Sequence, residues 1–141
     1  SMLLGDLMTI SQYQIPVKII IFNNRSLGMV KLEMRVEGYM NWQTDMVNPD
    51  FVKVAEAMNI AAWEAKEPKD VKQVLLNAFK HDGPAVVSIF TDPNALAMPP
   101  KIKFDQIVGL TNSMAKLMLN GKTAEIIDTA KSDLKYLKEL L

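Results

Sequence analysis

The amino-acid sequence predicts an α/β fold in which a mainly parallel sheet carries helices on both faces. Two runs, VKIIIF at residues 17–22 and AVVSIF at residues 85–90, are almost continuously apolar and rich in β-branched residues, as is typical of strands covered on both sides. Segments with apolar residues at helical spacing flank and separate these runs. Right-handed crossovers in such an alternation place the strands in parallel.

The composition limits the classes of function. The chain has 141 residues, of which 49% are hydrophobic and 23% are charged, which is typical of about one globular domain. Its 16 basic and 16 acidic side chains cancel, so the overall charge does not favour nucleic acid. The absence of cysteine excludes disulfides, thiolate metal sites and cysteine nucleophiles.

The first third of the chain predicts a helix, a strand and a second helix. Apolar residues recur at helical spacing up to about residue 13, and Pro16 ends that pattern before the strand at 17–22. An Arg-Ser-Leu-Gly turn follows the strand. It leads into a short helix predicted over residues 28–37, which Gly28 opens.

The middle of the chain predicts a loop and then four elements. Residues 38–48 are irregular and aromatic. Asn48 and Pro49 are expected to be the N-cap and first residue of a helix over 49–58. The other predicted elements are a strand at 61–65, a helix at 68–80 and the strand at 85–90.

The last third predicts a proline-containing connector over 91–103 and two helices, at about 104–119 and 124–141. The second of these helices carries an apolar stripe, which is expected to pack on this fold or on a partner subunit. The stripe consists of Ile127, Ala130, Leu134, Leu137 and Leu141.

Asn23 and Asn24 end the first predicted strand, at the sheet edge where parallel α/β sheets bind ligands. Two interpretations of this pair remain open. Asparagine is a common turn residue, because its amide bonds the local backbone. An amide oxygen is also a suitable ligand for magnesium, and the turn before Gly28 would leave backbone N–H groups available to an anion at a helix start.

Other side chains offer weaker candidates. Glu33 shares one helical face with Met29 and Val30, and it is either a solvated surface carboxylate or part of a site. The single histidine, His81, lies in a turn without a second histidine nearby and is expected at the surface. Two tryptophans are expected to be packing residues, Trp42 and Trp63.

Five motifs together indicate a family. SMLLGDL, IPVKIIIFNN, SLGMVKLEM, DGPAVV and LAMPPKIKFDQ resemble the C-terminal part of thiamine-diphosphate-dependent pyruvate oxidases and bacterial quinone-dependent pyruvate dehydrogenases, in the acetolactate-synthase-like superfamily. The resemblance runs from Ser1 to about Lys122. It implies a thiamine-diphosphate-binding fold truncated at its N-terminus, with the incomplete cofactor-binding domain at 1–94 and a C-terminal helical extension at 95–141.

The resemblance also implies a site. Thiamine diphosphate and Mg²⁺ would bind here, and FAD would bind outside this chain. The Asn24 side chain and the Ser26 main-chain carbonyl would be metal ligands, and Glu33 would have a catalytic role in orienting pyruvate. The residues expected to surround the cofactor are Asn24, Arg25, Ser26, Leu27, Gly28, Met29 and Val30.

The function implied is oxidative decarboxylation of pyruvate to acetate and carbon dioxide, with quinone or a related electron acceptor. The chain alone is expected to be inactive, because the aspartate ligand of the family motif would precede Ser1. Two alternatives remain open: acetolactate synthesis or another non-oxidative reaction of a 2-keto acid, and a non-catalytic module that docks to a membrane or partner. The resemblance further implies a homo-oligomer, cytoplasmic or peripheral at the inner face of the cell membrane through residues 95–141.

Overall fold

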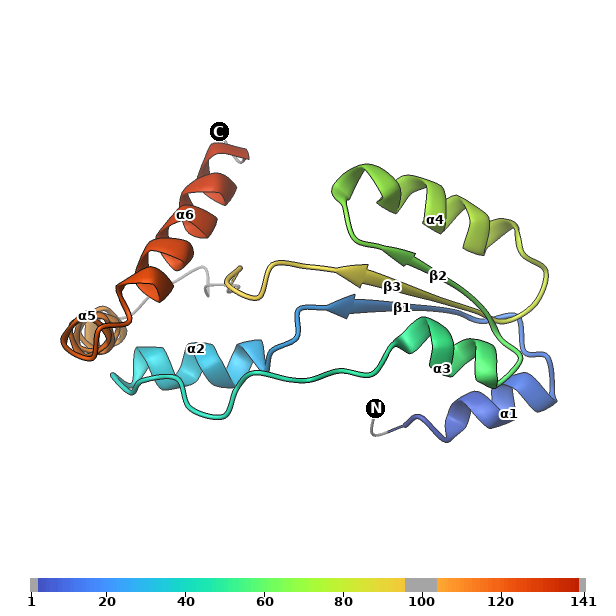
Figure 1. Ribbon diagram of the computed structural model, residues 1–141, viewed down its shortest axis with the longest axis horizontal. Coiled ribbons are helices and arrows are strands. Elements are labelled where there is room, and N and C mark those ends of the chain that lie inside the picture. Colours follow the sequence, from blue (N-terminus) through green and yellow to red (C-terminus); the bar gives the residue numbers. More distant parts are fainter. Residues whose placement is uncertain (1–2, 96–103, 140–141) are drawn as a thin grey trace. The chain divides into compact units, whose positions relative to one another are not determined.

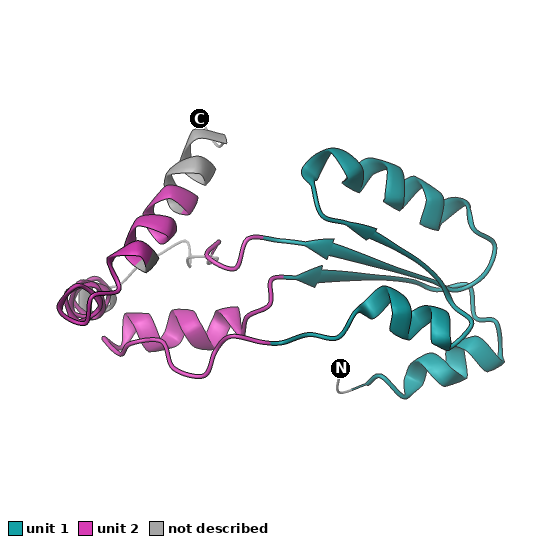
Figure 2. Ribbon diagram, in the orientation of Figure 1, with its two compact units in different colours: residues 1–23, 47–91 teal, residues 24–46, 92–141 magenta. Residues whose placement is uncertain are grey.

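The structure is a computed structural model that describes residues 3–95 and 104–139. Its contacts divide the chain into two compact units (Figure 2). Unit 1 comprises residues 1–23 and 47–91, and unit 2 comprises residues 24–46 and 92–141. The predicted domain boundary at residue 95 stays a prediction.

Unit 1 is built on a three-stranded sheet of β1 (Lys18–Asn23), β2 (Ala61–Ala65) and β3 (Ala85–Phe90). Both pairings are parallel, and the order is β1-β3-β2 (Figure 1). The pairs Lys18–Ala85 and Asn23–Phe90 mark the two ends of the β1–β3 ladder. The predicted α/β fold with a parallel sheet is therefore confirmed.

Helices cover both faces of this sheet, as predicted (Figure 1). α1 (Asp6–Gln12) and α3 (Phe51–Ala57) pack on one face, and α4 (Pro68–Lys80) packs on the other. Successive side chains of β3 alternate between the two faces: Val86 belongs to the core beneath α1 and α3, and Val87 to the core beneath α4. β3 is the central strand because it pairs with both β1 and β2, and Val87 has 0% exposure.

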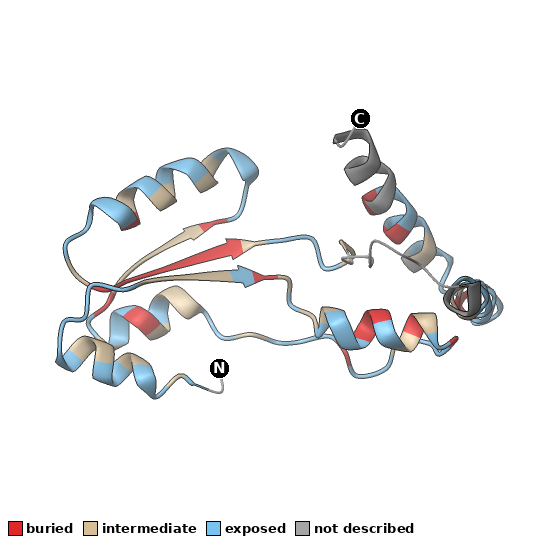
Figure 3. Cartoon of the chain, turned by 180° about the vertical axis from the view of Figure 1, so that it is seen from behind, coloured by how far each residue is buried: buried red, intermediate tan, exposed pale blue. Residues whose placement is uncertain are grey.

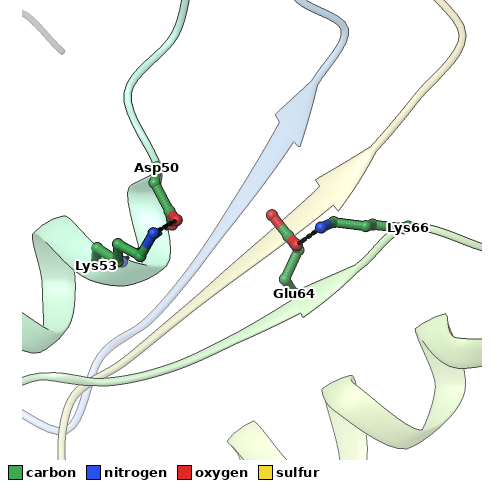
Figure 4. A network of polar contacts seen from close by, with 4 residues as sticks. All are labelled: Asp50, Lys53, Glu64 and Lys66. Carbon is green, nitrogen blue, oxygen red and sulfur yellow. Dashed lines mark hydrogen bonds and ion pairs between the residues drawn. The ribbon is translucent and has the colours of Figure 1, made fainter.

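The predicted start of α3 is wrong by two residues. Its N-cap is Asp50, whose carboxylate accepts a hydrogen bond of 3.1 Å from the N–H of Lys53. Asn48 was the expected cap, but its amide is engaged elsewhere, as described below. Asp50 also forms an ion pair with Lys53 at 3.1 Å, and Glu64 forms one with Lys66 at 2.9 Å (Figure 4). Such solvent-screened pairs contribute little to stability.

Unit 2 contains three helices, which are α2 (Gly28–Val36), α5 (Phe104–Leu119) and α6 (Thr123–Glu139). α2 ends at Val36, and Gly38, two residues further on, has a φ of 79°, in the left-handed region. The N–H of Tyr39 returns to the carbonyl of Met34 at 2.8 Å, which is the hydrogen bond that commonly closes a helix at a glycine.

α5 packs against this end of α2. The Ser113 hydroxyl donates to the carbonyl of Tyr39 at 2.9 Å, and the Lys116 ammonium donates to that of Gly38 at 2.8 Å. The two helices approach each other closely at Gly109, where a Cβ would lie 1.7 Å from the carbonyl oxygen of Val36. Only glycine fits at this position.

α6 buries two hydroxyl side chains in unit 2 and leaves the first two residues of the predicted apolar stripe exposed. Thr129 and Ser132 are buried, whereas Ile127 and Ala130 are exposed. The hydroxyl of Ser132 donates to a carboxylate oxygen of Asp92 at 2.6 Å. Packing of the stripe on this fold is therefore wrong for its first two residues, and packing on a partner stays a prediction.

Some predictions fall outside what the structure describes. Residues 96–103 of the predicted connector and residues 1–2 of the first predicted helix lie there. So do Leu141 and the side chains of Leu134 and Leu137. Of the helices that lie within residues 3–95 and 104–139, none is both long enough and apolar enough to cross a membrane.

Candidate functional site

The two asparagines after β1 have different environments. Asn23 is the last residue of β1 and is 5% exposed. Its side-chain oxygen accepts a hydrogen bond of 2.8 Å from the amide of Asn48, and its carbonyl accepts one of 3.2 Å from the N–H of Thr91. Asn24 is half-buried, and its side-chain oxygen accepts a hydrogen bond of 3.0 Å from the N–H of Ser26. Asn24 thus forms the turn that the local pattern predicts.

The backbone after Asn24 is held by a second segment of unit 2. Arg25 has a φ of 52°, in the left-handed region. Its carbonyl accepts a hydrogen bond of 2.8 Å from the N–H of Met46, and the N–H of Leu27 donates to the carbonyl of Thr44 at 2.8 Å. Ser26 and Asp45 face each other between these two bonds as an antiparallel pair.

The helix start that follows the loop is close to Asn24. A Cβ on Gly28 would lie 3.1 Å from the amide nitrogen of Asn24, so glycine allows this approach. Gly28, Met29 and Val30 are the first residues of α2, and N–H groups in a first helical turn have no partner within the helix. Such groups favour an anion by their orientation and by the helix dipole.

α2 buries two charged residues together with Leu32 and exposes two apolar ones, and Figure 3 colours its residues by burial. Lys31 and Arg35 are 5% and 4% exposed, whereas Met29 and Val30 are 63% and 45% exposed. Glu33 is also exposed, on the side of Met29 and Val30. The face predicted from helical spacing therefore exists, and it is the outward face of α2 in unit 2.

Buried polar contacts hold the inner face of α2. The Lys31 ammonium lies 3.4 Å from the side-chain oxygen of Asn94, and a guanidinium nitrogen of Arg35 donates to the hydroxyl of Thr129 at 3.2 Å. A polar cavity of about 280 Å³ lies beside Lys31. Its lining consists of Lys31, Asn41, Gln43, Thr44, Asp45, Pro93, Asn94 and Lys122.

Sequence reasoning missed the segment from Thr44 to Met46. It lies in the irregular stretch between helices and carries no chemical motif, so only its pairing with Arg25 and Leu27 identifies it.

Trp42 was expected to be a packing residue, which is wrong, since its exposure is 74%. Trp63 does pack on the core beneath α4, and His81 is exposed, as predicted.

The available groups fit a magnesium diphosphate. No hydrogen bond within the described part of the chain reaches the carbonyl oxygen of Ser26, and the Asn24 oxygen retains a second lone pair. Both are hard oxygen donors of the kind that Mg²⁺ takes together with phosphate oxygens. Residues 3–95 and 104–139 hold no cluster of three or more His, Cys, Asp or Glu, so Asn24 and Ser26 are not accompanied by a carboxylate cluster there.

Comparison with known proteins is consistent with this geometry. A family model described as thiamine pyrophosphate enzyme, C-terminal TPP binding domain, matches residues 1–89. The Bacillus subtilis protein YdaP, named provisionally as thiamine pyrophosphate-containing, is 28% identical over 94% of this chain. The mitochondrial acetolactate synthase catalytic subunit of Aspergillus candidus is 34% identical over 70% of the chain, and the acetolactate synthase large subunit of Pyropia yezoensis is 36% identical over 67%.

These relatives are much longer than the chain, which spans 23%, 14% and 16% of their respective lengths. The family model nevertheless covers β1, the loop from Asn24 to Gly28 and most of β3. The chain belongs to the thiamine pyrophosphate enzymes and corresponds to their C-terminal TPP-binding domain.

Proposed function

We propose that the chain holds the metal and diphosphate end of thiamine diphosphate in an enzyme that acts on a 2-keto acid, with acetolactate synthesis as the first candidate reaction. The family match over residues 1–89 supports the cofactor. The acetolactate synthases among its relatives, at 34% and 36% identity, support the reaction.

The observation that carries the proposal is the loop from Asn24 to Gly28. It offers the side-chain oxygen of Asn24 and the carbonyl of Ser26 to Mg²⁺, and the first N–H groups of α2 to the diphosphate. Bound thiamine diphosphate supplies the electron sink for loss of carbon dioxide from a 2-keto acid. Asn24 and Ser26 orient the metal, and the α2 start binds the phosphate charge.

The outward face of α2 is proposed as the substrate side. Met29 and Val30 offer apolar surface at 63% and 45% exposure, and Glu33 is an exposed carboxylate one turn further on. We assign Glu33 the role of orienting the substrate. Replacement by Gln should lower kcat with a smaller effect on cofactor affinity.

The experiment uses the whole enzyme that contains this chain, since the chain alone is expected to be inactive, and supplies pyruvate, thiamine diphosphate and Mg²⁺. The expected product is acetolactate, detected after its conversion to acetoin by acid. Asn24→Ala should abolish formation by removing a metal ligand, whereas Gln73→Ala, on the exposed side of α4, should leave it unchanged. Binding of magnesium thiamine diphosphate without acetolactate would retain the cofactor assignment and overturn the reaction.

Oxidative decarboxylation of pyruvate, with FAD and quinone, is the second candidate. The resemblance of the LAMPPKIKFDQ motif to pyruvate oxidases supports it. Pyruvate-dependent reduction of a quinone analogue, with co-purified flavin, is the expected result for this reaction. Acetolactate without acceptor reduction rules it out.

Membrane or partner contact through residues 95–141 stays a proposal of its own. Exposure of Ile127 and Ala130 supports it, because these residues begin the apolar stripe of α6. Sedimentation with liposomes should fall when Ile127 is replaced by Asp if this stripe contacts lipid.

The expected homo-oligomer is checked independently by light scattering, and a monomer would contradict it.

A further inference from the structure

The pairing between residues 25–27 and 44–46 determines which backbone groups of Ser26 stay available. The two hydrogen bonds of this pairing join Met46 to Arg25 and Leu27 to Thr44, each at 2.8 Å. Ser26 and Asp45 are the facing residues between them. In an antiparallel pair of this kind, the N–H and the C=O of the two facing residues themselves form no hydrogen bond in the ladder.

The N–H, hydroxyl and carbonyl groups of Ser26 therefore differ in their hydrogen-bond partners. Its N–H donates to the side chain of Asn24 at 3.0 Å, and its hydroxyl donates to the carbonyl of Thr44 at 3.3 Å. Its carbonyl oxygen receives no hydrogen bond within residues 3–95 and 104–139. The side chain of Ser26 is thus directed to Thr44, and the main-chain oxygen is the group left for a cation.

Thr44 is well placed to fix this arrangement. It is 3% exposed, and its carbonyl oxygen accepts two hydrogen bonds, one from the N–H of Leu27 and one from the hydroxyl of Ser26. A carbonyl oxygen has two lone pairs, so both bonds are compatible. The two donors lie on consecutive residues, which restricts rotation of the peptide group that carries the Ser26 carbonyl.

We infer that the Ser26 hydroxyl and the Thr44 carbonyl form a positioning contact, which holds the Ser26 main-chain oxygen in place for the metal ion. The inference rests on the proposed function, since the metal ion is what this oxygen would bind. Ser26 therefore acts on the metal in two ways: its main chain is the ligand, and its side chain orients that ligand through Thr44.

The test measures the Kd of Mg²⁺ at saturating thiamine diphosphate, by calorimetry on the protein expressed in full. Ser26→Ala keeps the main-chain ligand and removes only the contact with Thr44. Since one neutral hydrogen bond is lost, the Kd of Mg²⁺ should rise about three- to tenfold. Ser26→Thr retains the hydroxyl and suits an extended pairing position, so it should restore the Kd.

Ser113→Ala is the matched control. It removes another serine hydroxyl of unit 2 that donates to a backbone carbonyl, that of Tyr39, and it does not touch the Asn24–Gly28 loop. Its thermal stability should fall while the Kd of Mg²⁺ stays unchanged. With Mn²⁺ in place of Mg²⁺, the electron paramagnetic resonance spectrum should change in Ser26→Ala and not in Ser113→Ala.

The outcomes separate this inference from the proposed function. If the unmodified protein fails to bind magnesium thiamine diphosphate, both are overturned. If it binds, the inference alone is overturned by an unchanged Kd in Ser26→Ala, by an equal rise in Ser113→Ala, or by failure of Ser26→Thr to restore binding.

Discussion

The side-chain amide of Asn48 donates a hydrogen bond of 2.8 Å to the side-chain oxygen of Asn23. The contact joins the last residue of β1 to the segment that leads into α3, and Asn23 is buried there. This contact gives Asn23 a different role from that of its neighbour Asn24. Asn23 is a structural residue of unit 1, whereas Asn24 makes the turn and is the metal ligand that we propose.

Asn48→Ala should lower the free energy of unfolding by about 1 kcal/mol, because it removes one hydrogen bond to a buried acceptor. Urea unfolding measures the change. Gln73→Ala is the control, since it removes an amide–amide hydrogen bond of 2.9 Å at the surface of α4 and should cost less than about 0.5 kcal/mol. Equal losses of unfolding free energy in the two variants would show that the buried Asn23 contact stabilises no more than a surface hydrogen bond.

Gly28→Ala should weaken binding of thiamine diphosphate in the presence of Mg²⁺ about three- to tenfold. The new Cβ would lie 3.1 Å from the amide nitrogen of Asn24, which must then move by a few tenths of an ångström. Titration calorimetry measures the Kd. Gly5→Ala, whose Cβ would meet nothing within 4 Å, should bind as the unmodified protein does, and a similar loss there would contradict the explanation.

Asp50 should give unit 1 a pH-dependent contribution to stability. The N–H of Lys53 donates to its carboxylate, and this hydrogen bond holds the pKa of Asp50 below its ordinary value of 3.8. A lowered pKa in the folded state means that the contribution is present above the unfolded pKa and is lost as the pH falls through the folded one. Asp50→Asn keeps an oxygen acceptor for the cap without the charge.

The measurement for Asp50 is the urea midpoint of both proteins at about pH 7 and about pH 3. The advantage of the unmodified protein over Asp50→Asn should shrink at the lower pH. An advantage that stays constant between the two pH values would show that the charge plays no part in the cap.

Gly109→Ala should destabilise unit 2. The substitution of a glycine within a helix by alanine normally stabilises that helix, by about 1 kcal/mol. Here the Cβ would lie 1.7 Å from the carbonyl oxygen of Val36, so α5 and α2 must separate, at a cost of about 1–3 kcal/mol or more. Thermal unfolding measures the sign of the change, and an increase in Tm would show that the close approach is absent.

The sheet was predictable because its signals are local. The run at Ala85–Phe90 has apolar residues on both faces, and β3 is the strand buried between helices on both sides. Pro68 likewise begins α4, as a proline at a helix start should. Both the apolar run and the proline can be interpreted from neighbouring residues alone, without knowledge of contacts to distant parts of the chain.

The contacts that organise the site were not predictable from local sequence. Asn48 has the side-chain chemistry of an N-cap residue, but its amide donates a hydrogen bond to Asn23, which is 25 residues away in the chain. Asp50 caps the helix instead. The pairing of Ser26 with Asp45 depends on the course of an irregular loop. The periodicity of α2 gives its faces but not which of them is covered.

The orientation of α2 about its own axis depends on residues far along the chain. Lys31 is held by Asn94 and Arg35 by Thr129, at 3.4 and 3.2 Å, and these contacts leave Met29 and Glu33 on the other side. A substitution at Thr129 should therefore alter which side chains α2 exposes, without changing any residue of the face that we propose for the substrate. Searches for variants with altered selectivity should include α6 as well as α2.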